Sequence, residues 1–144
     1  MKKQIRTEII INAGSDRVWQ VLTNFSGYTI WNPFIIESLG KAVAGTRLKN
    51  TMLNNGKKMV FKPVITRCEP NTCFEWLGSL WVKGLFDGRH SFQIEPISAQ
   101  QVKLIQSEEF SGLLSGPILN KIGNDTRNNF IKMNQALKQV AEQG

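Results

Sequence analysis

Long apolar runs are absent from this sequence of 144 residues. A membrane-spanning helix needs about 18 or more consecutive apolar residues, and a secretory signal peptide needs an apolar segment of about 7–15 residues. Near the N-terminus the longest such segment is Ile9–Ile11. We therefore expect no stable membrane insertion and no export signal, and a cytoplasmic protein is the default expectation.

Cysteine and histidine are scarce. Cys68 and Cys73 flank the turn sequence EPNT, and His90 is the single histidine. The cysteines could face each other across a hairpin, but one pair without an export signal is more often two reduced thiols than a disulfide. The sequence leaves open whether they ever pair. A zinc site built on two cysteines needs histidine partners, so we expect no metal and no cofactor.

Acidic residues are outnumbered, with 11 Asp and Glu against 18 Lys and Arg and a net charge of +7. This excess raises the question of nucleic-acid binding. The basic residues are dispersed, however, and no recognition motif or basic run with interleaved aromatic residues accompanies them. Examples are Lys57, Lys58 and Lys62 around a turn and Lys121, Arg127, Lys132 and Lys138 along a predicted helix. We expect a solvated basic surface and no nucleic-acid partner.

Repeats, low-complexity segments and linkers rich in Pro, Gly or Ser are also missing. Residues 1–144 should therefore form a single domain, a length at which one hydrophobic core is usual. The sequence has no nucleophile elbow, phosphate-binding loop or paired carboxylates either. Any enzymatic chemistry must therefore come from a less conspicuous group of side chains.

The order of predicted elements indicates the fold class. A strand over 4–12 precedes a short helix over 16–24 and a loop or short irregular helix over 25–33. Six extended segments separated by short turns follow, at 33–40, 46–53, 58–68, 73–80, 85–95 and 101–110. Pro63 cannot donate to a strand ladder, so its strand should be bulged or locally at an edge.

The last element differs in kind. Ile118, Ile122, Phe130, Met133, Leu137 and Val140 recur at helical spacing. They predict an amphipathic helix from Pro117 to Glu142. An antiparallel meander with a long helix across one face is an α+β architecture. If the sheet curves around the helix, the two layers cannot touch along their whole length, and the remaining gap is a candidate cavity.

Alternation along the strands assigns side chains to faces. One face carries Phe86, Gly88, His90, Phe92 and Ile94 of one strand and Val102, Leu104, Gln106, Glu108 and Phe110 of the next. The same parity groups Phe74 with Trp76, and Met59 with Phe61 and Pro63. An ionised Glu108 facing inward must meet water, a donor or a cation. The interior is therefore predicted to be incompletely filled.

A lining of large, flat or flexible side chains suits a small apolar or aromatic ligand, with His90 and Glu108 as the polar anchors. In the stretch TIWNPFII, Asn32 and Pro33 predict a turn that leads into a strand. This turn should place Trp31 and Phe34 at the pocket rim. The candidate ligand-binding residues are Trp31, Phe34, Phe61, Trp76, Phe86, Phe92, Gln106, Phe110, Phe130 and Met133.

Four short motifs occur in order along the chain: Ala13 with Val18 and Trp19; Trp31 to Phe34; Gly88, His90 and Phe92; and Glu108, Phe110 and Gly112. With these motifs, nearly the whole chain resembles the polyketide cyclase/dehydrase-like branch of the START-like (SRPBCC) helix-grip superfamily. The resemblance implies a curved seven-stranded antiparallel sheet wrapped around a long C-terminal helix, with two short helices after the first strand. It also implies a cavity for lipid-like, aromatic or polyketide-like molecules, but not a particular reaction.

Three functions are consistent with these features. The first is binding or carriage of a lipid-, polyketide- or flavonoid-like molecule in the cavity. The second is an aromatase/cyclase- or dehydrase-type enzyme, in which His90 acts as general base and Glu108 orients it or serves as acid. The third is an interaction domain that uses its basic surface, with any cavity smaller than about 300 Å³. The sequence specifies neither the ligand nor the oligomeric state.

Overall fold

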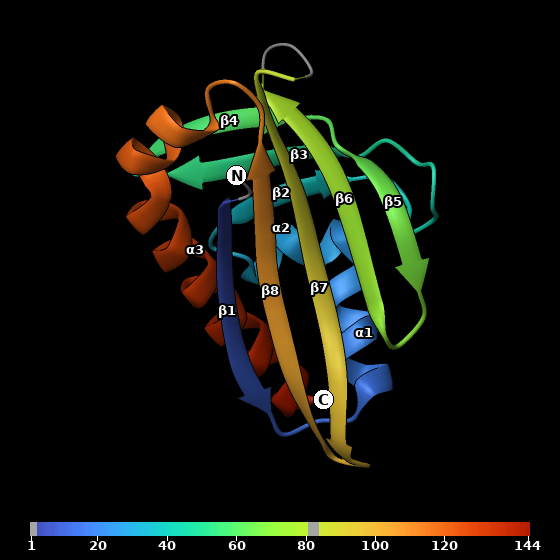
Figure 1. The fold of residues 1–144 in the computed structure, drawn as a ribbon. Coiled ribbons are helices and arrows are strands. Elements are labelled where there is room, and N and C mark those ends of the chain that lie inside the picture. Colours follow the sequence, from blue (N-terminus) through green and yellow to red (C-terminus); the bar gives the residue numbers. More distant parts are fainter. Residues whose placement is uncertain (1–2, 81–83) are drawn as a thin grey trace.

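The computed structural model describes residues 3–80 and 84–144. Its elements are β1 Lys3–Ile11, α1 Ser15–Thr23, a 3-10 turn Phe25–Gly27, α2 Tyr28–Trp31, β2 Ile35–Leu39, β3 Lys49–Asn54, β4 Lys57–Phe61, β5 Val64–Glu69, β6 Cys73–Leu80, β7 Phe86–Ser98, β8 Gln101–Ser111 and α3 Ser115–Gln143. The predicted α+β class, the two short helices after the first strand and the long C-terminal helix are confirmed (Figure 1).

The sheet differs from the seven-stranded prediction. Eight strands are found in the described residues, in a five-stranded sheet of order β1-β8-β7-β6-β5 and a three-stranded sheet of order β2-β3-β4. The extra strand arises because the segment predicted as one strand over 58–68 is broken at Pro63, between β4 and β5. Proline has no N–H to donate to the ladder. Its carbonyl still accepts a 2.8 Å hydrogen bond from Leu48 N, and a bridge between Arg47 and Val64 joins the two sheets.

The two sheets and the helices enclose one interior (Figure 1). The three-stranded sheet crosses one end of the five-stranded sheet, and α3 begins near this end and runs along the inner face. The C-terminal end of α3 is tied to α1, because the Arg17 guanidinium donates to the carbonyls of Val140 and Ala141. No helix among residues 3–80 and 84–144 is long and apolar enough to span a membrane.

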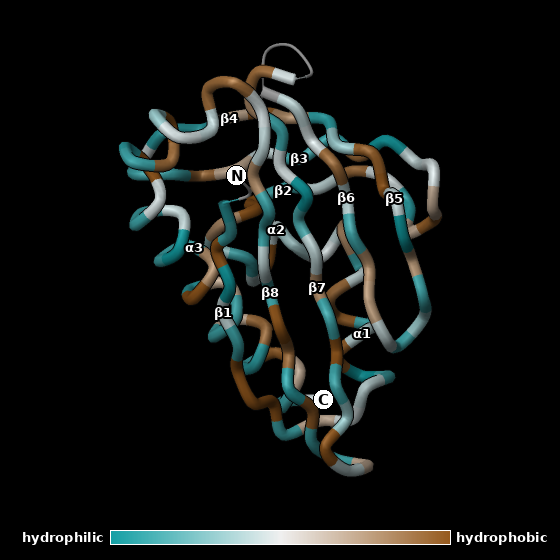
Figure 2. The backbone as a smooth tube through the Cα atoms, viewed as in Figure 1, coloured by the Kyte–Doolittle hydropathy of each residue, from teal (hydrophilic) through white to brown (hydrophobic). Residues whose placement is uncertain are grey.

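The hydrophobic core is one cluster of buried side chains, mainly from the five-stranded sheet, α1 and α3. Figure 2 shows hydrophobic and hydrophilic positions recurring along the strands, and the inward positions meet the apolar side of α3. Phe74, Phe92, Leu104, Met133 and Leu137 have no exposed surface. The rings of Phe74 and Phe92 stack with centroids 4.9 Å apart. Alternation therefore assigned the faces of β6, β7 and β8 correctly.

Cys68 and Cys73 are both free thiols. In the β5–β6 ladder, Cys68 lies opposite Phe74 and Cys73 lies opposite Glu69, so the two cysteines are not a cross-strand pair. The Cys68 thiol lies 3.2 Å from the carbonyl of Ala42, and the Cys73 thiol lies 3.0 Å from the Glu69 carboxylate. Burial raises the pKa of both thiols, that of Cys73 to about 11. In both cysteines burial thus favours the protonated thiol, the less nucleophilic form.

Candidate ligand-binding pocket

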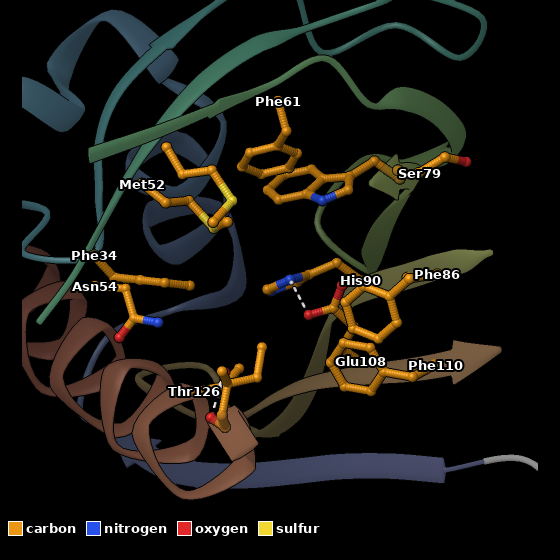
Figure 3. Close-up of a pocket in the computed structure, with 15 residues that line it drawn as sticks. Phe34, Met52, Asn54, Phe61, Ser79, Phe86, His90, Glu108, Phe110 and Thr126 are labelled. Atoms are coloured by element: carbon orange, nitrogen blue, oxygen red, sulfur yellow. Dashed lines mark hydrogen bonds and ion pairs between the residues drawn. The ribbon is translucent and has the colours of Figure 1, made fainter. Parts of the chain in front are cut away.

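A cavity of about 120 Å³ lies where the three-stranded sheet crosses the end of the five-stranded sheet, beside the first half of α3 (Figure 3). Its wall consists mainly of aromatic and methionine side chains. Seven predicted site residues line it: Phe34, Phe61, Trp76, Phe86, His90, Glu108 and Phe110. Phe34, Met52 and Phe61 face His90 and Glu108 across the cavity in Figure 3. The structure thus brings the polar pair and an apolar wall together.

Cross-strand register explains how residues distant in sequence form one wall. Trp76 on β6 pairs with His90 on β7, and His90 pairs with Glu108 on β8. One step along the same face, Gly78 pairs with Gly88, which pairs with Phe110. Because side chains in directly opposed positions point to the same face of a sheet, these rows form adjacent layers of the wall.

The cavity is small. Ligand pockets for drug-sized molecules measure about 300–1,000 Å³, whereas an apolar cavity of about 150 Å³ holds benzene. A cavity of about 120 Å³ therefore suits a single aromatic ring, and a larger ligand must extend through the mouth or displace wall residues. A cavity this small is also what the third hypothesis, an interaction domain with a filled interior, predicts. The polar pair within an apolar wall, His90 and Glu108, is what favours a binding role.

The polar pair lies deep in this wall. His90 Nδ1 is 3.5 Å from Glu108 Oε1, and the exposed fractions of the two side chains are 4% and 18%. The imidazole is enclosed by three aromatic rings, those of Trp76, Phe92 and Phe130, with centroids at 4.8–4.9 Å. Burial and ring packing fix the imidazole in one position, so its second nitrogen must be satisfied inside the protein.

Behind His90, a chain of buried hydrogen bonds leads to α3 and β1. His90 Nε2 lies 2.9 Å from Gln106 Oε1. The Gln106 amide nitrogen donates to the Phe130 carbonyl at 3.3 Å and to Asn134 Oδ1 at 2.7 Å. Asn134 Nδ2 donates to Thr7 Oγ1 at 2.9 Å, and the Thr7 hydroxyl donates to the Gln106 carbonyl at 3.0 Å. We call these five residues the buried relay.

Gly88 makes room for the Glu108 carboxylate. An added Cβ at Gly88 would overlap Oε2 of Glu108 and lie 3.1 Å from its Cδ. Gly88 is not among the residues of positive φ, so a side chain is excluded here by the carboxylate and not by the backbone. The glycine therefore lets Glu108 lie across β7 and reach His90.

Five predicted site residues lie outside the cavity lining: Trp31, Phe92, Gln106, Phe130 and Met133. Phe92, Phe130 and Met133 are fully buried in the core, and Gln106 is fully buried behind His90. Trp31 ends α2 and packs against Tyr28, with ring centroids 5.1 Å apart. Alternation identifies the inward face of a strand but not how far along it the cavity extends. Their role as ligand contacts remains a prediction.

Several lining residues were not predicted as site residues: Met52, Asn54, Met59, Gly78, Ser79, Gly88, Ile122 and Thr126. The spacing of Met59, Gly88 and Ile122 in the sequence does place them on inward faces. The sequence does not reveal the inward face of β3. Two of the three residues on this face, Asn50 and Asn54, are polar and are therefore easily taken for exposed positions. In fact Asn50 is fully buried and accepts a 2.5 Å hydrogen bond from Ser38.

No group of three or more His, Cys, Asp or Glu side chains close enough to hold a metal ion occurs in the part of the chain that the structure describes.

An antiparallel sheet gripping a long C-terminal helix, with a cavity between the layers, defines a helix-grip protein. The chain belongs to the family described as polyketide cyclase / dehydrase and lipid transport, whose model matches residues 2–142. The START-like (SRPBCC) resemblance seen in the sequence is thereby confirmed. No curated protein sequence matches the chain.

Solved structures agree with this assignment. An aromatase/cyclase from a Streptomyces species has a TM-score of 0.80 at 13% identity, with 99% of this chain and 94% of that chain covered. A START superfamily protein from Mycobacterium smegmatis has a TM-score of 0.75 at 18% identity, with 97% of each chain covered. Norcoclaurine synthase from Thalictrum flavum, in complex with dopamine and hydroxybenzaldehyde, has a TM-score of 0.74 at 14% identity, with 99% and 88% covered. At these identities the likeness establishes the fold alone.

Proposed function

We propose that this protein binds or carries a small apolar or aromatic molecule in the cavity between the sheet and α3. The observation that carries the proposal is a wall of mainly aromatic and methionine side chains in which buried His90 lies beside the partly buried carboxylate of Glu108. Apolar walls with a few convergent polar groups are typical of small-molecule sites. The family description, which names cyclisation, dehydration and lipid transport, supports ligands of this class.

The cavity volume limits the form of the ligand. About 120 Å³ accommodates one ring of a flavonoid- or polyketide-like molecule, by comparison with the benzene-sized cavity noted above. The rest of such a molecule would have to extend beyond the cavity or displace side chains of its wall. A single-ring compound such as p-cresol is therefore the smallest useful probe. Larger lipids and flavonoids are tested after it.

A cavity-filling variant tests the location. Thr126 lines the cavity, and its hydroxyl donates to the Ile122 carbonyl of its own helix at 3.0 Å. Thr126→Phe should occupy the cavity and weaken p-cresol binding at least about tenfold, the affinity equivalent of about 1.4 kcal/mol. Asn128→Phe places the same ring on the exposed side of α3 and should leave binding unchanged. Equal affinities for both variants, measured by titration calorimetry, would exclude this cavity as the site.

We propose as the alternative an enzyme of the aromatase/cyclase or dehydrase type. The observation that favours it is the 3.5 Å approach of His90 Nδ1 to Glu108 Oε1 in the pocket wall. His90 Nδ1 would take a proton from a carbon next to a carbonyl group, and that carbon would bond to a second carbonyl carbon. Glu108, in its acid form, would give a proton to the resulting alkoxide.

Turnover of a β-diketone substrate analogue separates the two proposals. If the protein is an enzyme, His90→Gln should abolish product formation while p-cresol still binds the cavity. Ligand binding without turnover in the unaltered protein would leave the binding proposal standing and remove the enzymatic one. Absence of binding across phenols, lipids and flavonoids in thermal shift and native mass spectrometry would contradict both.

A further inference from the structure

We propose that Gln106 is a positioning residue that fixes His90 as its Nε2–H tautomer, so that the polar end of the pocket presents hydrogen-bond acceptors to a ligand. The pocket should then select aromatic molecules that carry a donor, a hydroxyl or amino group, over analogues with acceptors alone. This inference rests on the proposed binding function and specifies its ligand class.

The orientation of Gln106 follows from a backbone group. A carbonyl oxygen only accepts hydrogen bonds, so the Gln106 atom 3.3 Å from the Phe130 carbonyl must be the amide nitrogen. The amide oxygen is then the atom that lies 2.9 Å from His90 Nε2. Because this oxygen also only accepts, His90 Nε2 must carry the proton.

The rest of the buried relay supports the same assignment. The Thr7 hydroxyl donates its only proton to the Gln106 carbonyl, so Thr7 Oγ1 must accept from Asn134 Nδ2. The oxygen of Asn134 consequently faces the Gln106 amide nitrogen at 2.7 Å. Reversing either amide would set oxygen against oxygen in a buried site, where each unsatisfied group is strongly unfavourable. The relay therefore has one consistent direction.

The fixed tautomer determines what the ligand meets. In neutral His90 the lone pair of Nδ1 is directed to the pocket side, where Glu108 Oε1 lies at 3.5 Å. In protonated His90, Nδ1 donates to Glu108. With Glu108 ionised, the groups left for a ligand at this end are acceptors in both states of His90, either Nδ1 or a carboxylate oxygen. The amide of Asn54 lies on the opposite wall in Figure 3, so it does not alter this end.

The tautomer can be measured directly, because His90 is the only histidine. With ¹⁵N-histidine labelling, neutral His90 should show a proton on Nε2 and none on Nδ1. Gln106→Leu should remove this preference, whereas Gln101→Leu, on the same strand but bonded to Asn12, should keep it. A proton on Nδ1 of neutral His90 in the unaltered protein, or an unchanged tautomer in folded Gln106→Leu, would overturn the assignment.

Ligand selection is measured with matched probes. p-Cresol should bind at least about tenfold more tightly than 4-methylanisole, which replaces the hydroxyl proton with a methyl group, and more tightly than p-toluate. Glu108→Gln adds an N–H donor to the wall and should reduce the preference over 4-methylanisole to less than about threefold. Equal binding of p-cresol and its ether would refute donor selection while the binding function survived. Failure of every probe to bind would overturn both proposals.

Discussion

Gly88 offers a way to move the Glu108 carboxylate without removing it. In Gly88→Ala the new Cβ would lie 3.1 Å from Glu108 Cδ and closer still to Oε2, whereas favourable contacts between carbon atoms are about 3.5–4.0 Å. The carboxylate must therefore leave the position beside Gly88 from which it reaches His90. The backbone does not resist the substitution, since Gly88 lies in β7 without a positive φ. We expect the free energy of unfolding to change by less than about 1 kcal/mol.

The effect on binding should be much larger. A hydrogen bond to a charged group contributes about 1.5–3 kcal/mol, so Gly88→Ala should weaken p-cresol binding about 10- to 150-fold. Gly78→Ala is the matched control, because Gly78 pairs with Gly88 and lines the same cavity. Its Cβ would meet Phe61 and Pro63 at 3.6 Å, an ordinary contact. Calorimetric titration that finds equal affinity in the two variants would refute the role of the carboxylate.

Three further predictions concern stability. Gln106→Leu should lower the free energy of unfolding by about 2–5 kcal/mol, because it leaves buried polar groups unsatisfied. In urea unfolding, the double variant Gln106→Leu/Asn134→Leu should lose less stability than the sum of the losses in the two single variants. Strict additivity of the two losses would contradict a coupled relay. Burial raises the pKa of Tyr28 above its ordinary 10.0, so the folded state keeps a proton that the unfolded chain releases. Stability should therefore fall above about pH 10 by about 1.4 kcal/mol per pH unit, and a Tyr28→Phe variant with the same slope would exclude this cause. Trp31→Ala should cost about 2–4 kcal/mol yet leave p-cresol affinity unchanged, because Trp31 lies outside the cavity lining; a parallel loss of affinity in titration would show otherwise.

Much of the fold could be predicted because its signals are local. Turn residues and period-two alternation define the strand segments, and the spacing along 117–142 defines α3. The predicted strand count was wrong at Pro63. The sequence predicted an irregularity there, but not that the segment would be divided into two strands that belong to different sheets. That outcome depends on how the carbonyl of Pro63 bonds to Leu48, fifteen residues away, which no local pattern encodes.

The site was less predictable for a physical reason. Alternation places His90 and Glu108 on the inward face, and their pairing follows from the register of β7 and β8. Thr7 and Asn134, by contrast, are polar residues that resemble surface positions in sequence. They are buried only because β1 and α3 pack together around Gln106. The relay that orients His90 is thus a property of the tertiary structure.

The methionine methyl groups provide the most direct test of ligand binding in this cavity. Met52 and Met59 line it, whereas Met133 is fully buried in the core outside the lining. In a protein labelled with ¹³C at the methionine methyl groups, p-cresol should shift the Met52 and Met59 signals saturably and give intermolecular nuclear Overhauser effects to them, with Met133 nearly unchanged. Absence of saturable shifts at Met52 and Met59, or equal shifts at Met133, would contradict a ligand site between the sheet and the first half of α3.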